Sequence, residues 1–449
     1  MKTSYERTKE LIKDIAPKSF CAAKWYNVSI WLGNGRTASC HHPLAHPVPK
    51  KELEKSASAL HNTQFKKEQR KKMLEGERPA ECGYCWKVED AAQDEDINSD
   101  RIYQTARYTE EEIKALKDIP WDKNVNPKTV EICFDNLCNL ACSYCNSEFS
   151  STWSKDIVKN GEYKNMVTDG GKTYRQDGSI AMPFGNKNEG NIYVKRFFDW
   201  FPEIKDGITE LRVSGGEPSR SPSFWKLIDM SDNEKFALAV NSNLIMEDSR
   251  LDRLVEAGKK FEKLDIYTSA ECMYKNQEFV RDGFDWDIWE KNVKKAVASP
   301  HINGMYVMMT ISLLGIWTVD KFVKQIVEWK KEVNDKHAFF MSVNILRFPS
   351  FQSVTMLPQT IKEDLANRIE KVMKEEYDWI NDLERNQLKR LLIYLRRVDS
   401  SMEDVDAYSK KRNDLINFVD QYAVRRNKPV EEYMPQEFND WYQELKNEE

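Results

Sequence analysis

The sequence predicts an α/β fold, in which a partial, open barrel of six β/α units follows a small cysteine-rich domain and precedes a helical region. Three observations support this prediction. Short apolar segments alternate with amphipathic ones from about residue 126, cysteines gather in the first hundred residues, and amphipathic patterns fill the chain after residue 357. Strands that alternate with helices form parallel sheets. The predicted domains are therefore residues 1–125, 126–356 and 357–449.

The first domain is predicted to be small, with a thin core. Residues 25–40 predict a hairpin around the Gly-Asn-Gly turn at residues 33–35. Residues 50–79 are rich in Lys, Glu and Gln, which predicts a long solvated helix. The segment CGYCW, residues 82–86, is expected to be a tight loop. A core this thin commonly needs a metal to stabilise it.

Six apolar segments are predicted to be the barrel strands: TVEICF (129–134), ITELRVSG (208–215), FALAVNSN (236–243), KLDIYTSA (263–270), MYVMMTIS (305–312) and AFFMSVNI (338–345). In barrels of parallel strands, active sites lie at the C-terminal strand ends. The insertion at residues 159–191 is rich in Gly, Asn and Lys, and DGGKTYRQDGS within it predicts a hairpin. Such an insertion is either a substrate lid or a surface excursion.

Charge and hydropathy argue against nucleic acid or a membrane as the main partner. The formal net charge is -5, with 68 Lys and Arg against 73 Asp and Glu. The first residues lack the apolar region of a secretory signal. The longest nearly apolar run, residues 305–317, is shorter than the ~20 residues that span a bilayer. We therefore expect a cytoplasmic protein.

Nine cysteines in a reducing compartment indicate metal or catalytic use rather than disulfides. Three of them, Cys138, Cys142 and Cys145, lie in the eight residues CNLACSYC, directly after the first predicted barrel strand. Cubane iron-sulfur clusters are held by four thiolates. Three protein thiolates would leave one iron open, much as a catalytic zinc keeps a free position. A zinc site completed by a distant ligand, or thiols packed in the core, are the alternatives.

CNLACSYC resembles the CxxxCxxC signature of radical S-adenosylmethionine (SAM) enzymes, in the form with an aromatic residue, here Tyr144, before the third cysteine. The segment Gly215, Gly216, Glu217 and Pro218 after the second strand is similar to the family's GGEP motif, which receives the SAM amino group. Two glycines allow close backbone approach, and a carboxylate suits an ammonium group. The resemblance implies a [4Fe-4S] cluster on the three cysteines, SAM on its open iron, and cleavage to a 5'-deoxyadenosyl radical that abstracts hydrogen.

Further site candidates follow from the same resemblance. Ser269 stands where the family often has a ribose-contacting hydroxyl, and Arg281 resembles an arginine that pairs with the SAM carboxylate. Asn243 is a candidate for the pocket wall. Cys272, after the fourth strand, is a candidate hydrogen donor to a substrate radical, although a small packed residue is its commoner role. Cys133 is expected in the core.

The N-terminal cysteines make a closed set of four: Cys21, Cys40, Cys82 and Cys85. The pattern alone fits zinc as well as an iron-sulfur cluster, and His41 or His42 could replace one ligand. The segments around these cysteines resemble the Twitch domain, and the whole chain resembles radical SAM proteins with an N-terminal Twitch domain. That resemblance favours a second, auxiliary [4Fe-4S] cluster, acting as an electron relay or as a structural element, over zinc.

The resemblance implies an enzyme that takes electrons from a reduced flavodoxin or ferredoxin-type donor. A peptide or protein is the favoured substrate, by analogy with relatives that carry auxiliary clusters. Oxidation or rearrangement of a small molecule or nucleotide is the second hypothesis. The third is a non-catalytic iron-sulfur or zinc protein, which would have no need of GGEP or an open iron.

Overall fold

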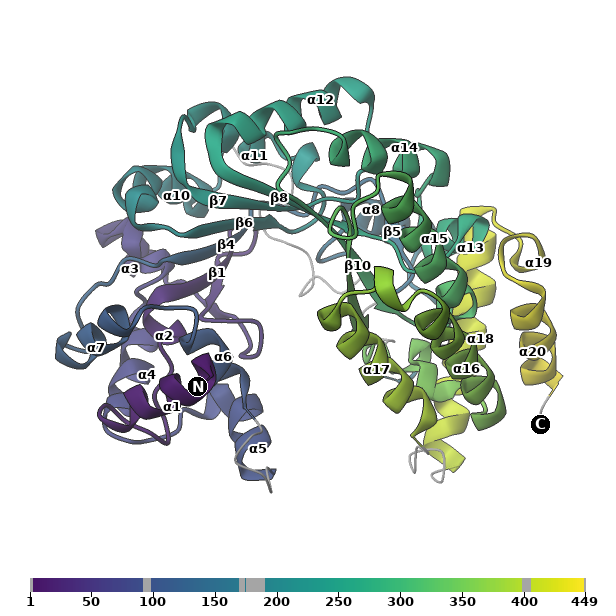
Figure 1. Ribbon diagram of the computed structural model, residues 1–449, viewed down its shortest axis with the longest axis horizontal. Helices are drawn as coiled ribbons and strands as arrows, with labels where there is room; N and C mark the ends of the chain where they lie inside the picture. Colours follow the sequence, from purple (N-terminus) through teal and green to yellow (C-terminus); the bar gives the residue numbers. More distant parts are fainter. Residues whose placement is uncertain (1–2, 92–97, 169–173, 175–189, 398–404, 448–449) are drawn as a thin grey trace.

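The computed structural model describes residues 3–91, 98–168, 174, 190–397 and 405–447. Their strands form a nine-stranded sheet in the order β11-β10-β8-β7-β6-β4-β1-β2-β3, which arches across the molecule (Figure 1). The N-terminal helices lie below one end of the arch, and the helices of the C-terminal region lie below the other (Figure 1). Apart from Tyr174, the hairpin predicted within the insertion lies outside the described residues.

The six predicted barrel strands are all present: β4 (Thr129–Cys133), β6 (Glu210–Ser214), β7 (Glu234–Asn241), β8 (Phe261–Ser269), β10 (Gly304–Ile311) and β11 (Phe340–Ile345). Each pairs in parallel with the next one along the chain. In β6 and β10 buried residues alternate with half-buried ones, and in β11 they alternate with half-buried or exposed ones, so one face packs against helices while the other borders open space. The α/β prediction is confirmed, and the sheet is open rather than closed.

Amphipathic helices connect these strands and cover the outer face of the sheet (Figure 1). They bury large aromatic residues, such as Trp200, Trp289 and Trp329, each at most 1% exposed. Their bounds are α8 (Ser151–Asn160), α10 (Ile192–Ile204), α11 (Pro222–Met230), α12 (Asp248–Ala257), α13 (Tyr274–Val280), α14 (Trp286–Val297) and α15 (Val319–Glu332).

The predicted N-terminal hairpin forms, and it joins the main sheet. Strand β1 (Asn27–Trp31) pairs antiparallel with β2 (Arg36–Ala38), which pairs with β3 (His46–Pro47). On its other side β1 pairs in parallel with β4. The sheet is thus continuous from the N-terminal region into the six parallel strands. A small separate core lies beside it, built around residues such as Phe20 and Trp25.

Two N-terminal expectations were wrong. Residues 50–79 hold α3 (Lys50–Lys55) and α4 (Gln64–Leu74), with a 3-10 turn at Ala57–Leu60 between them. One face of helix α4 is buried rather than solvated, because Lys66 and Arg70 are fully buried and donate to the backbone oxygens of Asn27 and Lys24. The expected loop at residues 82–86 is the start of helix α5 (Gly83–Ala91). The other helices here are α1 (Ser4–Lys13), α2 (Ala23–Tyr26), α6 (Asp100–Thr105) and α7 (Glu110–Asp118).

The C-terminal region is helical, as predicted, with α16 (Gln359–Glu375), α17 (Asp382–Arg396), α18 (Val405–Arg426), α19 (Val430–Tyr433) and α20 (Gln436–Asn447). Helix α17 covers the outer edge of β11. The Glu384 carboxylate accepts from the backbone N–H of Met341 at 2.9 Å, and the Gln387 side chain accepts from that of Val343 at 2.5 Å. These contacts occupy strand-edge groups that would otherwise be free to pair. None of the helices in the described parts of the chain is long and apolar enough to cross a membrane.

Candidate functional site

The loop with three cysteines leaves the C-terminal end of β4. Within it, β5 (Ala141–Cys142) pairs antiparallel with β9 (Arg281–Asp282), so the middle cysteine is held against the segment after α13. Thr152, at the start of α8, donates to the Cys138 carbonyl at 2.7 Å. Backbone contacts thus fix the loop at the edge of the sheet where the sequence predicted chemistry.

The thiol of Cys142 is buried, and those of Cys138 and Cys145 are half-buried. Burial, with the neighbouring Cys142, raises the pKa of Cys138 to about 12. Burial also raises the pKa of Cys142, against the opposing effect of Arg281, whose Nη1 lies 3.6 Å from the Cys142 Sγ. The thiols are close enough to affect one another, and a guanidinium is directed at one sulfur. This donor set fits a three-thiolate cluster, which binds sulfur in its anionic form.

The two glycines after β6 lie directly against the cysteine loop. A Cβ on Gly216 would meet the Leu137 carbonyl oxygen at 2.4 Å, which is too close for any side chain. Gly215 has φ +122°, and a Cβ there would meet the Cys133 Sγ at 2.5 Å. The backbone N–H of Glu217 donates to the Leu137 oxygen at 2.6 Å. Glycine is therefore required at both positions for the two loops to touch.

Glu217 is 2% exposed and forms hydrogen bonds with the segments that follow β4, β6 and β7. Its Oε1 accepts from Ser219 N–H and Ser242 Oγ, and its Oε2 accepts from Asn243 N–H at 2.7 Å. Burial raises the pKa of Glu217, and these hydrogen bonds oppose the rise. A carboxylate has about four acceptor positions, so Oε2 can take one more donor. Asn243 also reaches the cysteine loop, donating to Asn139 Oδ1 at 3.0 Å.

Arg281 is held by a partner that the sequence did not single out. Its Nε and Nη2 form a bidentate pair with Glu271, which is fully buried, at 2.9 to 3.2 Å. Burial alone would lower the pKa of Arg281, but Glu271 raises it well above its ordinary value. Tyr144 donates to Glu271 at 2.9 Å, and its ring lies 5.4 Å from the guanidinium. Glu271 follows the predicted strand segment in YTSAE, so its position at a strand end was the available signal.

The remaining candidates lie at the end of β8. Ser269 is half-buried and pairs across the sheet with Met308. Cys272 is fully buried, and its thiol donates to Gln277 Oε1 at 3.1 Å. That contact favours the structural role of Cys272 over hydrogen donation. Cys133 is 2% exposed, as expected for a core residue.

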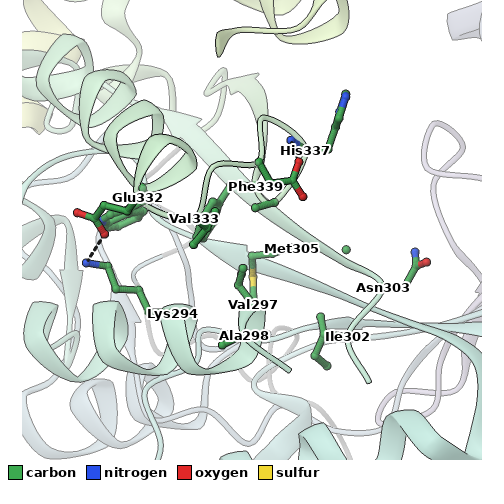
Figure 2. Close-up of a pocket in the computed structure, with 14 residues that line it drawn as sticks. Lys294, Val297, Ala298, Ile302, Asn303, Met305, Glu332, Val333, His337 and Phe339 are labelled. Carbon is green, nitrogen blue, oxygen red and sulfur yellow. Dashed lines mark hydrogen bonds and ion pairs between the residues drawn. The ribbon is translucent and has the colours of Figure 1, made fainter. Parts of the chain in front are cut away.

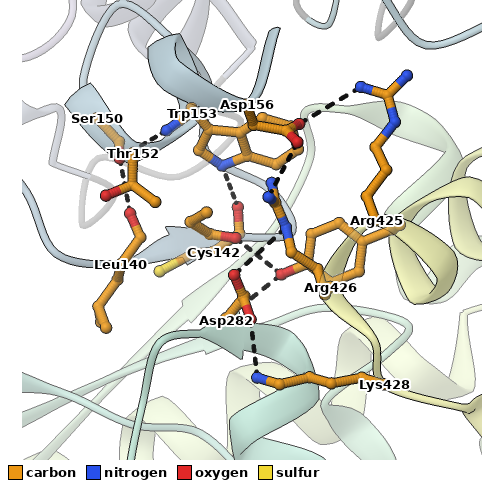
Figure 3. A network of polar contacts seen from close by, with 12 residues as sticks. Leu140, Cys142, Ser150, Thr152, Trp153, Asp156, Asp282, Arg425, Arg426 and Lys428 are labelled. Atoms are coloured by element: carbon orange, nitrogen blue, oxygen red, sulfur yellow. Dashed lines mark hydrogen bonds and ion pairs between the residues drawn. The ribbon is translucent and has the colours of Figure 1, made fainter. Parts of the chain in front are cut away.

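A network of hydrogen bonds and ion pairs connects the C-terminal region with the cysteine loop and its neighbouring segments (Figure 3). Tyr422 on α18 donates to the Ala141 carbonyl at 2.7 Å, and Trp153 on α8 donates to the Cys142 carbonyl at 2.9 Å. Arg426 forms ion pairs with Asp156 at 3.1 Å and Asp282 at 3.3 Å. The end of α18 therefore joins the two segments between which the middle cysteine lies.

The four N-terminal cysteines line a cavity together with His42, Asp100 and Arg101. Burial, with the nearby Cys40 and Cys82, raises the pKa of Cys21 to about 12, while the buried Lys24 opposes the rise. Lys24, itself ion-paired with Glu81, lies next to a set that is anionic when deprotonated, so the residue types suit either centre named above. Among the described residues, no group of three or more His, Cys, Asp or Glu side chains is arranged to hold a single metal ion.

A second cavity, of about 690 Å³, lies on the inner face of the sheet and is called the inner-face cavity below. Seven strands, from β1 to β11, contribute side chains to it, and α17 closes one side. Ligand sites commonly have volumes of about 300 to 1,000 Å³. His41, beside Cys40, lines this cavity rather than the one with four cysteines.

A third cavity, of about 380 Å³, lies at the amino ends of β10 and β11, at the end of the strands opposite to the cysteine loop (Figure 2). Its lining mixes apolar and polar residues, and includes the ion pair between Lys294 and Glu332 at 3.2 Å (Figure 2). Its position places it away from all seven candidate metal-binding cysteines.

Comparisons with known proteins give little beyond this geometry. No family model and no curated protein matches the chain. Among solved structures, a chain described as native anSMEcpe with bound AdoMet and Cp18Cys peptide aligns over 54% of this chain and 58% of its own length, at 14% identity and a TM-score of 0.30. The aligned part thus spans little more than half of that chain. A likeness this low assigns neither fold nor function, so the function has to be argued from the site.

Proposed function

We propose that this chain is a radical SAM enzyme that modifies a peptide or protein. The observation that carries the proposal is the contact between the cysteine loop and the GGEP loop. Gly216 lies against Leu137, and Glu217 binds that residue's carbonyl, one residue before Cys138. Two motifs 77 to 79 residues apart in the sequence therefore meet at one strand edge, which a chance motif match would not require.

The chain's own residues would hold and orient the reactants. Cys138, Cys142 and Cys145 would ligate a [4Fe-4S] cluster, which together with SAM supplies reductive cleavage to a 5'-deoxyadenosyl radical. The free acceptor position on Glu217 suits the SAM ammonium group. Arg281 places a fixed positive charge beside Cys142, where it would stabilise a thiolate.

The N-terminal cysteines would hold an auxiliary [4Fe-4S] cluster, with zinc as the alternative. The buried Lys24 supports an anionic centre there without choosing between the two metals. The hairpin that carries Cys40 also presents His41 to the inner-face cavity, so this centre lies next to the space where a substrate would bind. An electron relay is therefore favoured over a purely structural role. Reduced flavodoxin or a ferredoxin-type protein would supply electrons in the cytoplasm.

Two other functions stay in competition. A small molecule or nucleotide is an alternative substrate, because the inner-face cavity has the volume of an ordinary ligand site. A non-catalytic metal protein is the other alternative, and it leaves the GGEP contact without a purpose.

The decisive experiment measures iron, sulfide and zinc per chain after anaerobic reconstitution, with 5'-deoxyadenosine formed from SAM on reduction. About eight irons with 5'-deoxyadenosine is the expected result. About four irons and one zinc would keep the enzyme and replace the auxiliary cluster. If 5'-deoxyadenosine did not form, or if Cys138→Ala formed it at the wild-type rate, the proposed function would be wrong.

A further inference from the structure

The inner-face cavity is lined by charged side chains that are nearly all neutralised by one another. Arg107 pairs with Glu210 at 2.8 Å, and Arg212 lies 3.5 Å from the same carboxylate. Glu384 pairs with the buried Lys330 at 2.8 Å. Each of these groups therefore has a partner of opposite charge within the protein.

Glu131 is different. Among the described residues it forms no ion pair with a lysine or arginine, and the basic side chain within 4 Å of it is that of His41, at 3.6 Å, which is 66% exposed. Arg212, its register partner on β6, is close enough for the Glu131 charge to help raise its pKa against the effect of burial. The guanidinium nevertheless donates to Asn241 and lies over the ring of Tyr267 rather than pairing directly with Glu131. Glu131 thus presents a carboxylate to the cavity without a direct ion pair to a lysine or arginine among the described residues.

The Glu131 carboxylate is also held in one orientation. Ser214 on β6 donates to its Oε1 at 2.8 Å, and Ser29 on β1 donates to its Oε2 at 3.1 Å. These hydroxyls come from the strands on either side of β4. The side chain is 20% exposed, so it is partly desolvated and still reachable. A fixed, partly buried carboxylate binds an ammonium or guanidinium group more strongly than a mobile surface one.

An aromatic row lies farther along the same face. Tyr267, Tyr306 and Phe340 are register partners on β8, β10 and β11, and their rings stack at 4.4 and 5.1 Å. Strand β8 is three strands from β4, or about 14 Å along the sheet at about 4.8 Å per strand. An extended peptide covers about 3.3 to 3.6 Å per residue, so about four residues reach from Glu131 to the row.

We propose that the inner-face cavity binds an extended peptide segment, with a lysine or arginine side chain on Glu131 and an apolar side chain about four positions away on the row of Tyr267, Tyr306 and Phe340. This inference deepens the proposed function and depends on it only for what happens after binding. The carboxylate selects the cation, and the aromatic row provides a wall for an apolar group.

The test measures dissociation constants by ligand-observed NMR on the reconstituted full chain, without reductant. The probes are the capped pentapeptide Lys-Gly-Gly-Gly-Phe, its reverse sequence, and analogues with norleucine or glutamate for lysine, or alanine for phenylalanine. We expect at least one of the two lysine peptides to bind at least ten-fold tighter than its norleucine and glutamate analogues. Glu131→Gln should remove that preference. Glu210→Gln, which changes a neutralised carboxylate in the same cavity, should keep it.

Equal binding of the lysine and norleucine peptides by the wild-type chain would overturn the inference, and this comparison does not require any variant to fold. Equal losses in Glu131→Gln and Glu210→Gln would also overturn it. Unchanged affinity of the alanine analogue would remove the aromatic row from the proposal. Formation of 5'-deoxyadenosine is measured separately, so lysine-selective binding without it would leave the site intact and refute only the radical chemistry.

Discussion

Replacing Gly216 with alanine tests the contact on which the proposed function rests. The new Cβ would meet backbone atoms only, at 2.4 Å from the Leu137 oxygen and 2.8 Å from the Asn136 carbonyl carbon. Restoring an ordinary contact of about 3.4 Å to that oxygen requires the two loops to separate by about 1 Å. Overpacking of this kind costs about 1 to 3 kcal/mol of folding free energy. Misplacement by about 1 Å lowers rates by about 100-fold.

We therefore expect Gly216→Ala to keep its iron, because the cysteines are unchanged, and to form 5'-deoxyadenosine about 100-fold more slowly. The assay is single-turnover 5'-deoxyadenosine formation on anaerobically reconstituted protein, with iron determined in the same samples. Gly207→Ala is the matched control, since a Cβ there meets nothing within 4 Å. If both variants cleaved SAM at the wild-type rate, the GGEP loop would not position the reactants and our reasoning would fail.

Three more predictions follow from the sites. Cys82→Ala should lower iron from about eight to about four per chain, whereas Cys272→Ala should keep all of it, and equal iron in both would contradict the auxiliary cluster. Arg426→Met should cost about 2 kcal/mol in urea unfolding and change the electron paramagnetic resonance spectrum of the reduced cluster, while the exposed Arg253→Met costs under about 0.5 kcal/mol. Burial lowers the pKa of His61 well below 6.5, so the unfolded chain takes up its proton first and stability falls as the pH drops below 6.5. The loss should reach about 1.4 kcal/mol at pH 5.5, measured by urea unfolding against His61→Asn, and a pH profile shared by both proteins would exclude it.

The parallel strands could be predicted because their pattern is local. Short apolar runs between amphipathic segments mark these strands, such as residues 305–309 in β10, and in β6 buried apolar residues alternate with half-buried ones. The three-cysteine loop could be placed because it follows the first of these strands. Helix α4 was misjudged because the rule that Lys and Arg mark a solvated face fails where backbone carbonyls accept from Lys66 and Arg70.

The partners of the site residues could not be predicted from spacing. Tyr422 lies 281 residues from Ala141, whose carbonyl it binds, and Tyr422 belongs to none of the motifs that the sequence shows. Glu271 stands at a predicted strand end, but its pairing with Arg281 follows only from the fold. Contacts of this kind depend on how the C-terminal helices and strand ends meet, which one sequence does not encode in any local pattern.

The parallel pairing of β1 with β4 also determines how long β1 is without its parallel partner during synthesis. Asn27 pairs with Thr129, so β1 leaves the ribosome 102 residues before its parallel partner. At about 5 to 20 residues per second, its edge stays open for roughly 5 to 20 s on the nascent chain. During that interval β1 has only β2 beside it, and exposed strand edges invite pairing with other chains. Slow translation across residues 32–128 would therefore lower the yield of folded protein more than an equal delay after β4 has emerged.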